Sequence, residues 1–159
     1  MDREWGVEES VAVAADPAVV YRAVSEVRRM GEWSPECRAV WARRGPLRAG
    51  DRFVGFNRRG PFVWFTTCRV TTAEPGREFA FRVDALGLPV ARWGYRFEPD
   101  GDGGTTLTEY WQDLRTGRGA PFAELLGKVF TGVPAQRRAA ANRAGMRATL
   151  ARIRQSLTA

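Results

Sequence analysis

Glu109 is the side chain whose type and position point most directly to chemistry. No other acidic residue lies between Asp102 and Asp113, and Glu109 alternates with two apolar residues, Leu107 and Trp111. If those two face inward, Glu109 does too, because every second side chain of a strand lies on the same face. Burial among aromatic groups raises the pKa of a carboxyl group, which can then act as an acid or a base near neutral pH. The alternative is a polar anchor that pairs with an arginine or lies at the mouth of a cavity.

The absence of histidine narrows the chemistry further. The 159 residues include none, which excludes Ser-His-Asp and Cys-His nucleophile systems, histidine bases and zinc sites built from imidazole. Proton transfer would therefore depend on Asp, Glu, Tyr, Cys, Arg or Lys128. We take Glu109 and Tyr95 as the candidate catalytic residues, and we expect neither a metal nor a cofactor.

Several polar and aromatic side chains are predicted to share the inward face of a sheet. Strand alternation places Asn57, Thr66 and Cys68 on the same face as a series of aromatic residues. The bulkiest of these exceed what a plain core requires and can stack on a planar ligand; they are Trp64, Trp93, Tyr95 and Trp111. The residues that we expect to contact a ligand are Trp33, Asn57, Trp64, Cys68, Phe81, Trp93, Trp111, Asn142 and Met146.

Three of these candidates also have a purely structural interpretation. Asn142 interrupts an apolar helix stripe, and its buried amide needs hydrogen-bond partners from a ligand or from the sheet. Trp33 lies where a helical segment meets the sheet, so it either contacts a ligand at the rim or closes one end of the core. Cys68 has no histidine or lysine nearby to lower its thiol pKa, which favours a role as a small buried residue.

The elements that would position these residues follow from periodicity and turn signals. Val7–Val13 alternates like a half-buried strand, and Asp16-Pro17 begins a short helix. A second helical turn spans Arg28–Trp33 and must end before Pro35. Six further segments rich in aromatic and β-branched residues predict an antiparallel meander. They are Cys37–Arg43, Asp51–Arg58, Phe62–Thr72, Glu78–Asp84, Val90–Glu98 and Thr105–Asp113.

The last third of the chain is predicted to be helical. Pro121–Phe130 forms a short apolar segment, and an amphipathic helix of about six turns starts at Val133. Its apolar stripe consists of Ala135, Ala139, Asn142, Met146, Leu150, Ile153 and Leu157. The arginines that lie outside this stripe are Arg137, Arg138, Arg143, Arg147, Arg152 and Arg154.

Basic charge gathers in this C-terminal segment. The formal net charge is +7, and residues 114–159 hold nine basic groups against Glu124 alone. A basic face can meet nucleic acid or an anionic membrane. No aromatic residue interleaves the arginines to stack on bases, so a nucleic-acid partner is not expected, and membrane contact is possible but not favoured. Without an apolar signal segment or a charge-free stretch above nine residues, a reduced cytoplasmic protein is expected.

The order of these elements predicts the architecture of an α+β domain spanning residues 1–159. A sheet with one apolar face must be covered, and the long C-terminal helix is the only large apolar element available. We expect a curved seven-stranded antiparallel sheet wrapped around that helix, with two short helices after the first strand. Since one helix cannot fill the whole concave face, a cavity is expected between helix and sheet.

Four groups of residues add a family resemblance. They are Arg29–Glu36 (RMGEWSPE), Gly50–Arg58 (GDRFVGFNR), Gly103–Glu109 (GGTTLTE), and Thr131–Val133 (TGV) with Asn142–Met146 (NRAGM) and Thr149-Leu150. Over nearly the whole chain they resemble the START-like (SRPBCC) superfamily, in its polyketide cyclase/dehydrase branch. The resemblance implies a helix-grip fold with a deep cavity for hydrophobic ligands. Members of this superfamily include cyclases, aromatases and lipid carriers.

These observations lead to one functional hypothesis and one alternative. The leading hypothesis is binding of a hydrophobic, aromatic or polyketide-like small molecule in the central cavity. As an enzyme, the protein would be a cyclase or dehydratase without metal, in which the cavity positions a reactive chain and Glu109 or Tyr95 moves protons. The alternative is a non-catalytic carrier of lipids or other hydrophobic ligands that contacts membranes through its basic helix. Polar groups converging on one cavity wall would favour the enzyme; a uniformly apolar cavity would favour the carrier. The sequence gives no indication of the oligomeric state.

Overall fold

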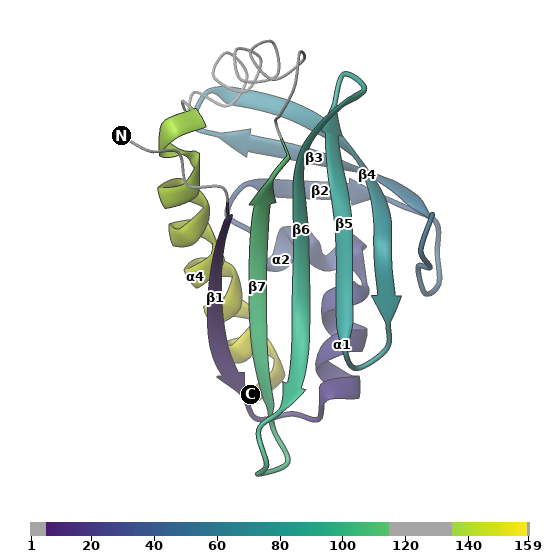
Figure 1. The fold of residues 1–159 in the computed structure, drawn as a ribbon, viewed down its shortest axis with the longest axis vertical. Helices are drawn as coiled ribbons and strands as arrows, with labels where there is room; N and C mark the ends of the chain where they lie inside the picture. Colours follow the sequence, from purple (N-terminus) through teal and green to yellow (C-terminus); the bar gives the residue numbers. More distant parts are fainter. Residues whose placement is uncertain (1–5, 115–134, 159) are drawn as a thin grey trace.

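The computed structural model describes residues 6–114 and 135–158, and its centre is a curved antiparallel sheet (Figure 1). The strands are β1 (Gly6–Val13), β2 (Cys37–Trp41), β3 (Arg52–Arg59), β4 (Phe62–Glu74), β5 (Glu78–Ala85), β6 (Leu88–Pro99) and β7 (Thr105–Asp113). Their order across the sheet is β1-β7-β6-β5-β4-β3-β2, so consecutive strands pair throughout the meander and β1 joins beside β7.

Three helical segments follow β1 or close the described chain. The α-helix α1 (Pro17–Ser25) begins where the Asp16 carboxylate accepts a hydrogen bond from the backbone N–H of Ala18 at 2.8 Å. A short 3-10 turn over Val27–Arg29 leads into α2 (Met30–Trp33). The long helix α4 covers Ala135–Thr158. The helix predicted over Pro121–Phe130 lies outside the described residues.

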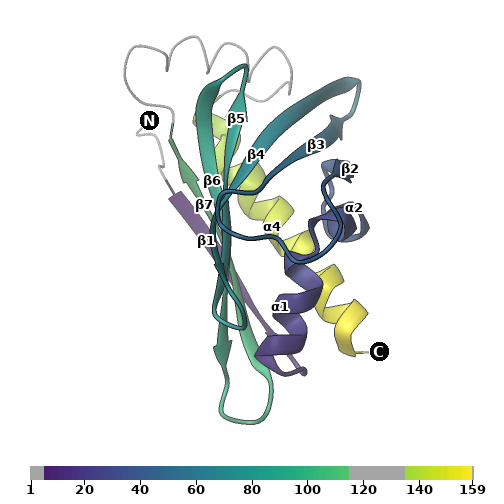
Figure 2. The same cartoon turned by 90° about the vertical axis from the view of Figure 1, so that its right-hand side faces the viewer.

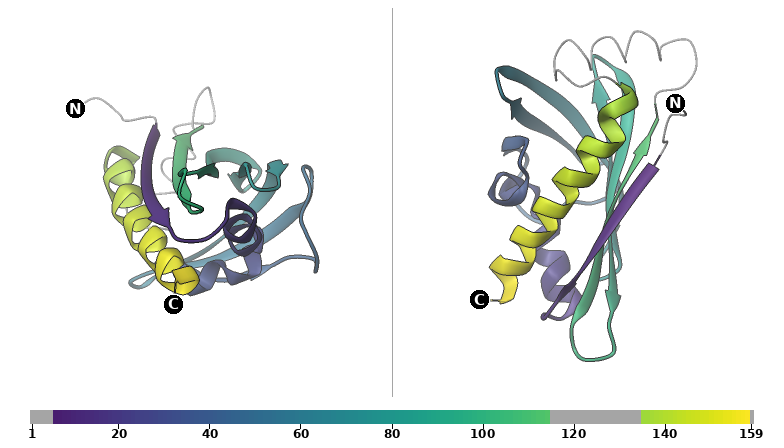
Figure 3. Two further views of the ribbon diagram at one scale, coloured as in Figure 1. Left: turned by 90° about the horizontal axis from the view of Figure 1, so that it is seen from below. Right: turned by 90° about the vertical axis from the view of Figure 1, so that its left-hand side faces the viewer.

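The helices all lie on the concave side of the sheet. Seen from the side, α4 runs diagonally across this face while α1 and α2 occupy the part that it leaves open (Figure 2). From below, the sheet curls around the helices, and α4 lies close to β1 (Figure 3). This arrangement confirms the predicted α+β helix-grip fold, with its seven-stranded sheet, two short helices after the first strand and long C-terminal helix.

The buried residues form two separate clusters along α4. The larger one joins α1, the middle of the sheet and the C-terminal half of α4, and includes Val20, Phe79, Leu107, Leu150 and Ile153. The smaller one joins the N-terminal half of α4 to β1, β6 and β7, and consists of Val7, Ala91, Trp111, Ala139 and Met146. The helix is therefore anchored in different surroundings at its two ends.

Several strand boundaries differ from the predicted ones, most clearly at the hairpin between β5 and β6. The sequence predicts strands that end at Asp84 and resume at Val90, but β5 and β6 are joined by Leu86 and Gly87 alone, and Leu88 already pairs with Ala85. Both turn residues have positive φ, 50° and 79°, as the tightest hairpin turns require. β2 ends at Trp41, two residues earlier than predicted.

Close packing of one aromatic ring fixes the middle of β6. Gly94 lies opposite Tyr110 of β7, and a Cβ atom added at Gly94 would collide with the Tyr110 ring. The Tyr110 hydroxyl hydrogen-bonds to Glu78 of β5. The ring thus spans three strands on the convex face, over a position that only glycine can occupy without a shift.

None of the helices in the described parts of the chain combines the length and apolar character needed to span a bilayer.

Candidate functional site

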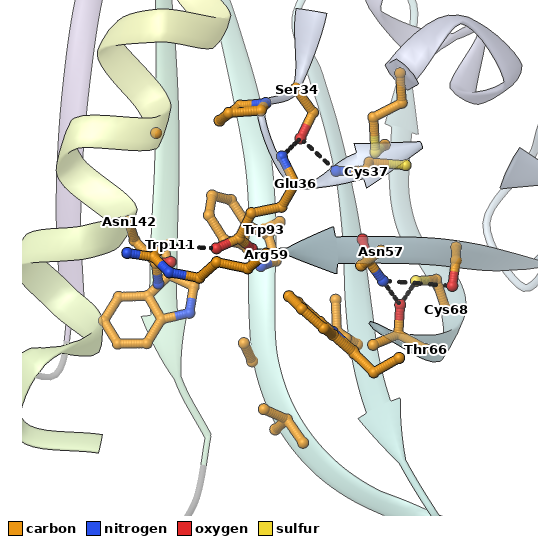
Figure 4. Close-up of a pocket in the computed structure, with 18 of the residues that line it drawn as sticks. Ser34, Glu36, Cys37, Asn57, Arg59, Thr66, Cys68, Trp93, Trp111 and Asn142 are labelled. Atoms are coloured by element: carbon orange, nitrogen blue, oxygen red, sulfur yellow. Dashed lines mark hydrogen bonds and ion pairs between the residues drawn. The ribbon is translucent and has the colours of Figure 1, made fainter. Parts of the chain in front are cut away.

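A cavity of about 750 Å³ lies between the concave face of the sheet and α4. Its walls come from α2 and its connection to β2, from strands β2 to β7, and from α4 between Arg138 and Thr149 (Figure 4). Most candidates from the sequence line it, namely Asn57, Trp64, Cys68, Phe81, Trp93, Tyr95, Glu109, Trp111, Asn142 and Met146.

Trp33 is the candidate that the structure places elsewhere. Its side chain is only 2% exposed, belongs to the larger core cluster and does not line the cavity. The guanidinium of Arg29 lies 4.8 Å from the centre of its ring, and Arg152 of α4 donates to its backbone oxygen at 3.2 Å. Of the two roles considered for Trp33, closing one end of the core is therefore the one that its contacts fit.

Tyr95 and Glu109 form a buried polar pair in the cavity wall. They lie directly opposite each other on β6 and β7, and the Tyr95 hydroxyl donates to Glu109 Oε1 at 3.0 Å. Burial raises the pKa of Glu109 from 4.5 to about 8, although the hydrogen bond from Tyr95 acts in the opposite direction. Burial, followed by the charge of Glu109, raises the pKa of Tyr95 well above 10. At neutral pH this site thus holds a carboxylic acid beside a neutral phenol.

The second carboxyl oxygen of Glu109 faces different surroundings. Oε2 is buried and has no hydrogen-bond partner in the part of the chain that the structure describes. Glu109 also lines the cavity, and its partnerless buried oxygen lacks a hydrogen bond that a molecule bound against this wall would supply. The pair can therefore donate a proton from Oε2 while Tyr95 stabilises the carboxylate that remains.

Large aromatic side chains supply the flat, apolar part of the wall. Trp93 and Trp111 lie opposite each other on β6 and β7, one pleat beyond Tyr95 and Glu109 on the same face. Phe81 continues this surface onto β5, opposite Trp93. A planar or hydrophobic molecule would find aromatic surface directly beside the Tyr95–Glu109 pair.

A small polar group lines the opposite part of the cavity, on β3 and β4 (Figure 4). Asn57 Nδ2 donates to Thr66 Oγ1 at 3.4 Å, and the thiol of Cys68 lies 3.9 Å from the same oxygen. Burial raises the pKa of Cys68 to about 12 and that of Cys37 to about 11. Both thiols therefore stay protonated at neutral pH and are poor nucleophiles.

A second polar group, which the sequence reasoning missed, lies where α4 faces β2 and β3. Glu36 accepts from Arg138 Nη2 at 2.8 Å and from Arg59 Nη1 at 3.1 Å. The helical wheel placed Arg138 outside the apolar stripe, yet its side chain is only 16% exposed and lines the cavity. The available signal was spacing, since Arg138 lies one turn before Asn142.

Figure 4 shows how the labelled residues are distributed around the cavity. Near α4 the figure shows Glu36, Arg59, Trp93, Trp111 and Asn142, whereas the Asn57 group lies across from them.

Thr149 is a further buried lining residue that was not predicted, although it lies three residues after Met146 on the same helix face. Within residues 6–114 and 135–158, no group of three or more His, Cys, Asp or Glu side chains is placed to hold a metal ion.

Comparison with known proteins finds a family and several solved structures that are similar to this chain. Residues 4–158 match the model of a family described as polyketide cyclase / dehydrase and lipid transport. The solution structure of a Polyketide_cyc-like protein from Corynebacterium glutamicum is similar, with 32% sequence identity, a TM-score of 0.63, and coverage of 99% of this chain and 93% of that one. None of the curated proteins matches this chain.

Two more distant structures share the fold. The Zhui aromatase/cyclase from Streptomyces sp. R1128 is 16% identical, with a TM-score of 0.70 over 96% of this chain and 92% of that one. A Mycobacterium smegmatis protein, Ms6760, is also 16% identical, with a TM-score of 0.61 over 99% of this chain and 97% of that one. At this identity the similarity concerns the fold alone.

Proposed function

The chain belongs to the polyketide cyclase/dehydrase and lipid transport family, and from that premise we propose that it binds a hydrophobic, aromatic or polyketide-like small molecule in its cavity and transfers protons to it through Glu109. The single observation that carries the proposal is the buried carboxylic acid of Glu109 in the wall of a cavity of about 750 Å³, with one oxygen that has no partner in the described part of the chain. That volume lies within the range of roughly 300–1,000 Å³ typical of small-molecule sites.

The chemistry that suits this geometry is dehydration of a β-hydroxy ketone, the step that follows ring closure by an aldol reaction. Glu109 Oε2 gives its proton to the hydroxyl group, the C–O bond breaks and water leaves. The carboxylate then accepts the proton released from the adjacent carbon, which restores the acid. Tyr95 supports this cycle as a hydrogen-bond donor to Oε1, because its own pKa is too high for it to act as the base.

Polar groups lie on several parts of the cavity wall and do not converge on one, and their presence favours this proposal over that of a passive carrier. A carrier for purely apolar molecules has no need of the buried acid or of the polar groups around Asn57 and Glu36, each of which costs free energy to bury. The basic helix is also partly engaged within the molecule. Arg147 pairs with Glu9 of β1 at 3.1 Å, and Arg152 is bound to the backbone of Trp33.

Binding is tested with a neutral fluorescent probe, N-phenyl-1-naphthylamine, and a matched pair of variants on α4. Ala141 lines the cavity, whereas its neighbour Ala140 is exposed and does not. Ala141→Trp should therefore abolish the fluorescence increase of the probe, and Ala140→Trp should leave it unchanged. Absence of binding to the wild-type protein, or equal binding to both variants, would contradict a ligand site in this cavity.

Proton transfer is tested separately with a β-hydroxy ketone that carries a naphthyl group, since its dehydration produces a conjugated enone with new absorbance. Glu109→Gln should slow this reaction by roughly 10²–10⁴-fold, while binding of N-phenyl-1-naphthylamine stays within a few fold. If the wild-type protein binds the probe but does not dehydrate this substrate faster than the Gln variant, the cavity acts as a carrier site.

A further inference from the structure

We infer that the natural ligand carries a carboxylate group and that Arg138 and Asn142 of α4 receive it. This inference rests on the proposed function, because it names the chemical class of ligand that the cavity takes. It concerns the α4 wall of the cavity, whereas the proposed proton transfer takes place on β7.

Two buried donors on this wall are without an acceptor. Arg138 Nη1 and Asn142 Nδ2 are both buried, and neither has a hydrogen-bond partner in the described residues. The two side chains lie one helical turn apart, so they share one side of α4, and both line the cavity. A buried donor left unpaired destabilises the folded protein, most of all when it carries charge. A carboxylate has two oxygens, and one bound against this wall would offer an acceptor to each donor.

Glu36 explains why Arg138 is ready to bind an anion. The guanidinium is a planar fork, and a carboxylate is the group that matches its geometry. Glu36 occupies one prong, Nη2, at 2.8 Å, which holds the side chain in place, and the other prong, Nη1, has no partner among the residues that the structure describes. Glu36 is shared with Arg59 at 3.1 Å, so one carboxylate faces two arginines and a positive charge remains uncompensated.

The net charge of the other residues that line the cavity is also positive. Glu109 is mostly protonated at neutral pH, because burial raises its pKa to about 8. The other charged residues that line the cavity are four arginines and two carboxylates, namely Arg38, Arg58, Arg59 and Arg138 against Glu36 and Asp84. Asp84 is also held by Arg82 at 3.0 Å. The electrostatic field of the lining therefore favours a negatively charged ligand.

The test compares 2-naphthoate with 2-naphthamide, which have nearly the same shape and differ in charge. Isothermal titration calorimetry should show that the wild-type protein binds the carboxylate at least about 10-fold more tightly than the amide. Arg138→Gln should remove this preference, and Asn142→Leu should reduce it several-fold. Arg154→Gln removes the same charge from an exposed position of the same helix and should leave the preference unchanged. Binding of N-phenyl-1-naphthylamine to Arg154→Gln should stay within about twofold of wild type, and measurable binding of this probe to Arg138→Gln and Asn142→Leu shows that the hydrophobic site has formed in them.

The outcomes separate this inference from the proposed function. If N-phenyl-1-naphthylamine binds but the wild-type protein does not prefer naphthoate over naphthamide, the inference of a carboxylate ligand is wrong, whereas the proposed hydrophobic site stands. A preference that survives both Arg138→Gln and Asn142→Leu also overturns it. Should Arg138→Gln fail to fold, as judged by thermal unfolding, Asn142→Leu decides alone, because an apolar side chain in place of a buried unpaired amide preserves packing. If no probe binds, the proposed function fails, and the inference fails with it.

Discussion

Replacing Glu109 with glutamine is expected to remove one specific pH dependence from the free energy of unfolding. Burial raises the pKa of Glu109 from 4.5 to about 8 in the folded protein. Between these pH values the folded chain keeps a proton that the unfolded chain releases, so the free energy of unfolding falls as the pH rises. Each pH unit within this window costs at most about 1.4 kcal/mol, and the loss ends above pH 8. From about pH 5.5 to 7.5 the wild-type protein should lose roughly 2–3 kcal/mol through this group, and Glu109→Gln should lose none of it.

The composition of the chain keeps other side chains from obscuring this pH dependence. The sequence contains no histidine, so no side chain with an ordinary pKa titrates in the middle of this window. Urea unfolding followed by tryptophan fluorescence, at three pH values, gives the free energy for both proteins. Tyr95→Phe serves as a control, because it removes the hydrogen bond that lowers the pKa of Glu109 and should extend the slope to higher pH. A difference between wild type and Glu109→Gln that stays constant within about 0.5 kcal/mol across the window would refute the reasoning.

Three further predictions concern packing and reactivity. Leu150→Ala should lower the free energy of unfolding in urea by about 2–5 kcal/mol, whereas Arg147→Ala should change it by about 0.5 kcal/mol or less. The reason is burial, since Leu150 is 2% exposed and the Arg147 side chain is 66% exposed. Equal costs would mean that the packed face of α4 is misassigned. Gly94→Ala should cost about 1–3 kcal/mol through its clash with the Tyr110 ring, and the cost should largely disappear in a Tyr110→Ala background, which a double-mutant cycle measures. Cys68, buried and with its pKa raised to about 12, should react with a disulfide reagent at pH 8 only in urea; equally fast labelling in native buffer would contradict its burial.

The fold could be predicted because each signal that defines it is local. Alternation along the strands, the helix-starting Asp16-Pro17 and the break at Pro35 need only neighbouring residues. The same locality explains the errors at the strand ends. Whether Leu88 belongs to a turn or to a strand depends on the partner strand, and pairing with Ala85 is decided by the hairpin as a whole.

The candidate site was predictable only in part, for a related reason. Glu109, Trp93 and Trp111 lie on one face of adjacent strands, so alternation alone brings them together. Arg138 could not be placed in this way, because its position depends on Glu36, which is 102 residues away in the sequence. A long arginine side chain at the edge of an apolar stripe can turn either to solvent or to a buried partner, and only the tertiary structure decides between them.

The two separate core clusters along α4 have a consequence for how proteins of this fold diverge. The C-terminal half of the helix, through Leu150 and Ile153, belongs to the cluster that holds most of the buried side chains. The N-terminal half, with Asn142 and Met146, faces the cavity. Substitutions at cavity-facing positions of α4 outside both core clusters, such as Ala141, can therefore alter which molecule is accepted while the larger core cluster stays intact. Selection can change such positions at a smaller cost in stability than at Leu150 or Ile153, which allows one scaffold to acquire new ligands.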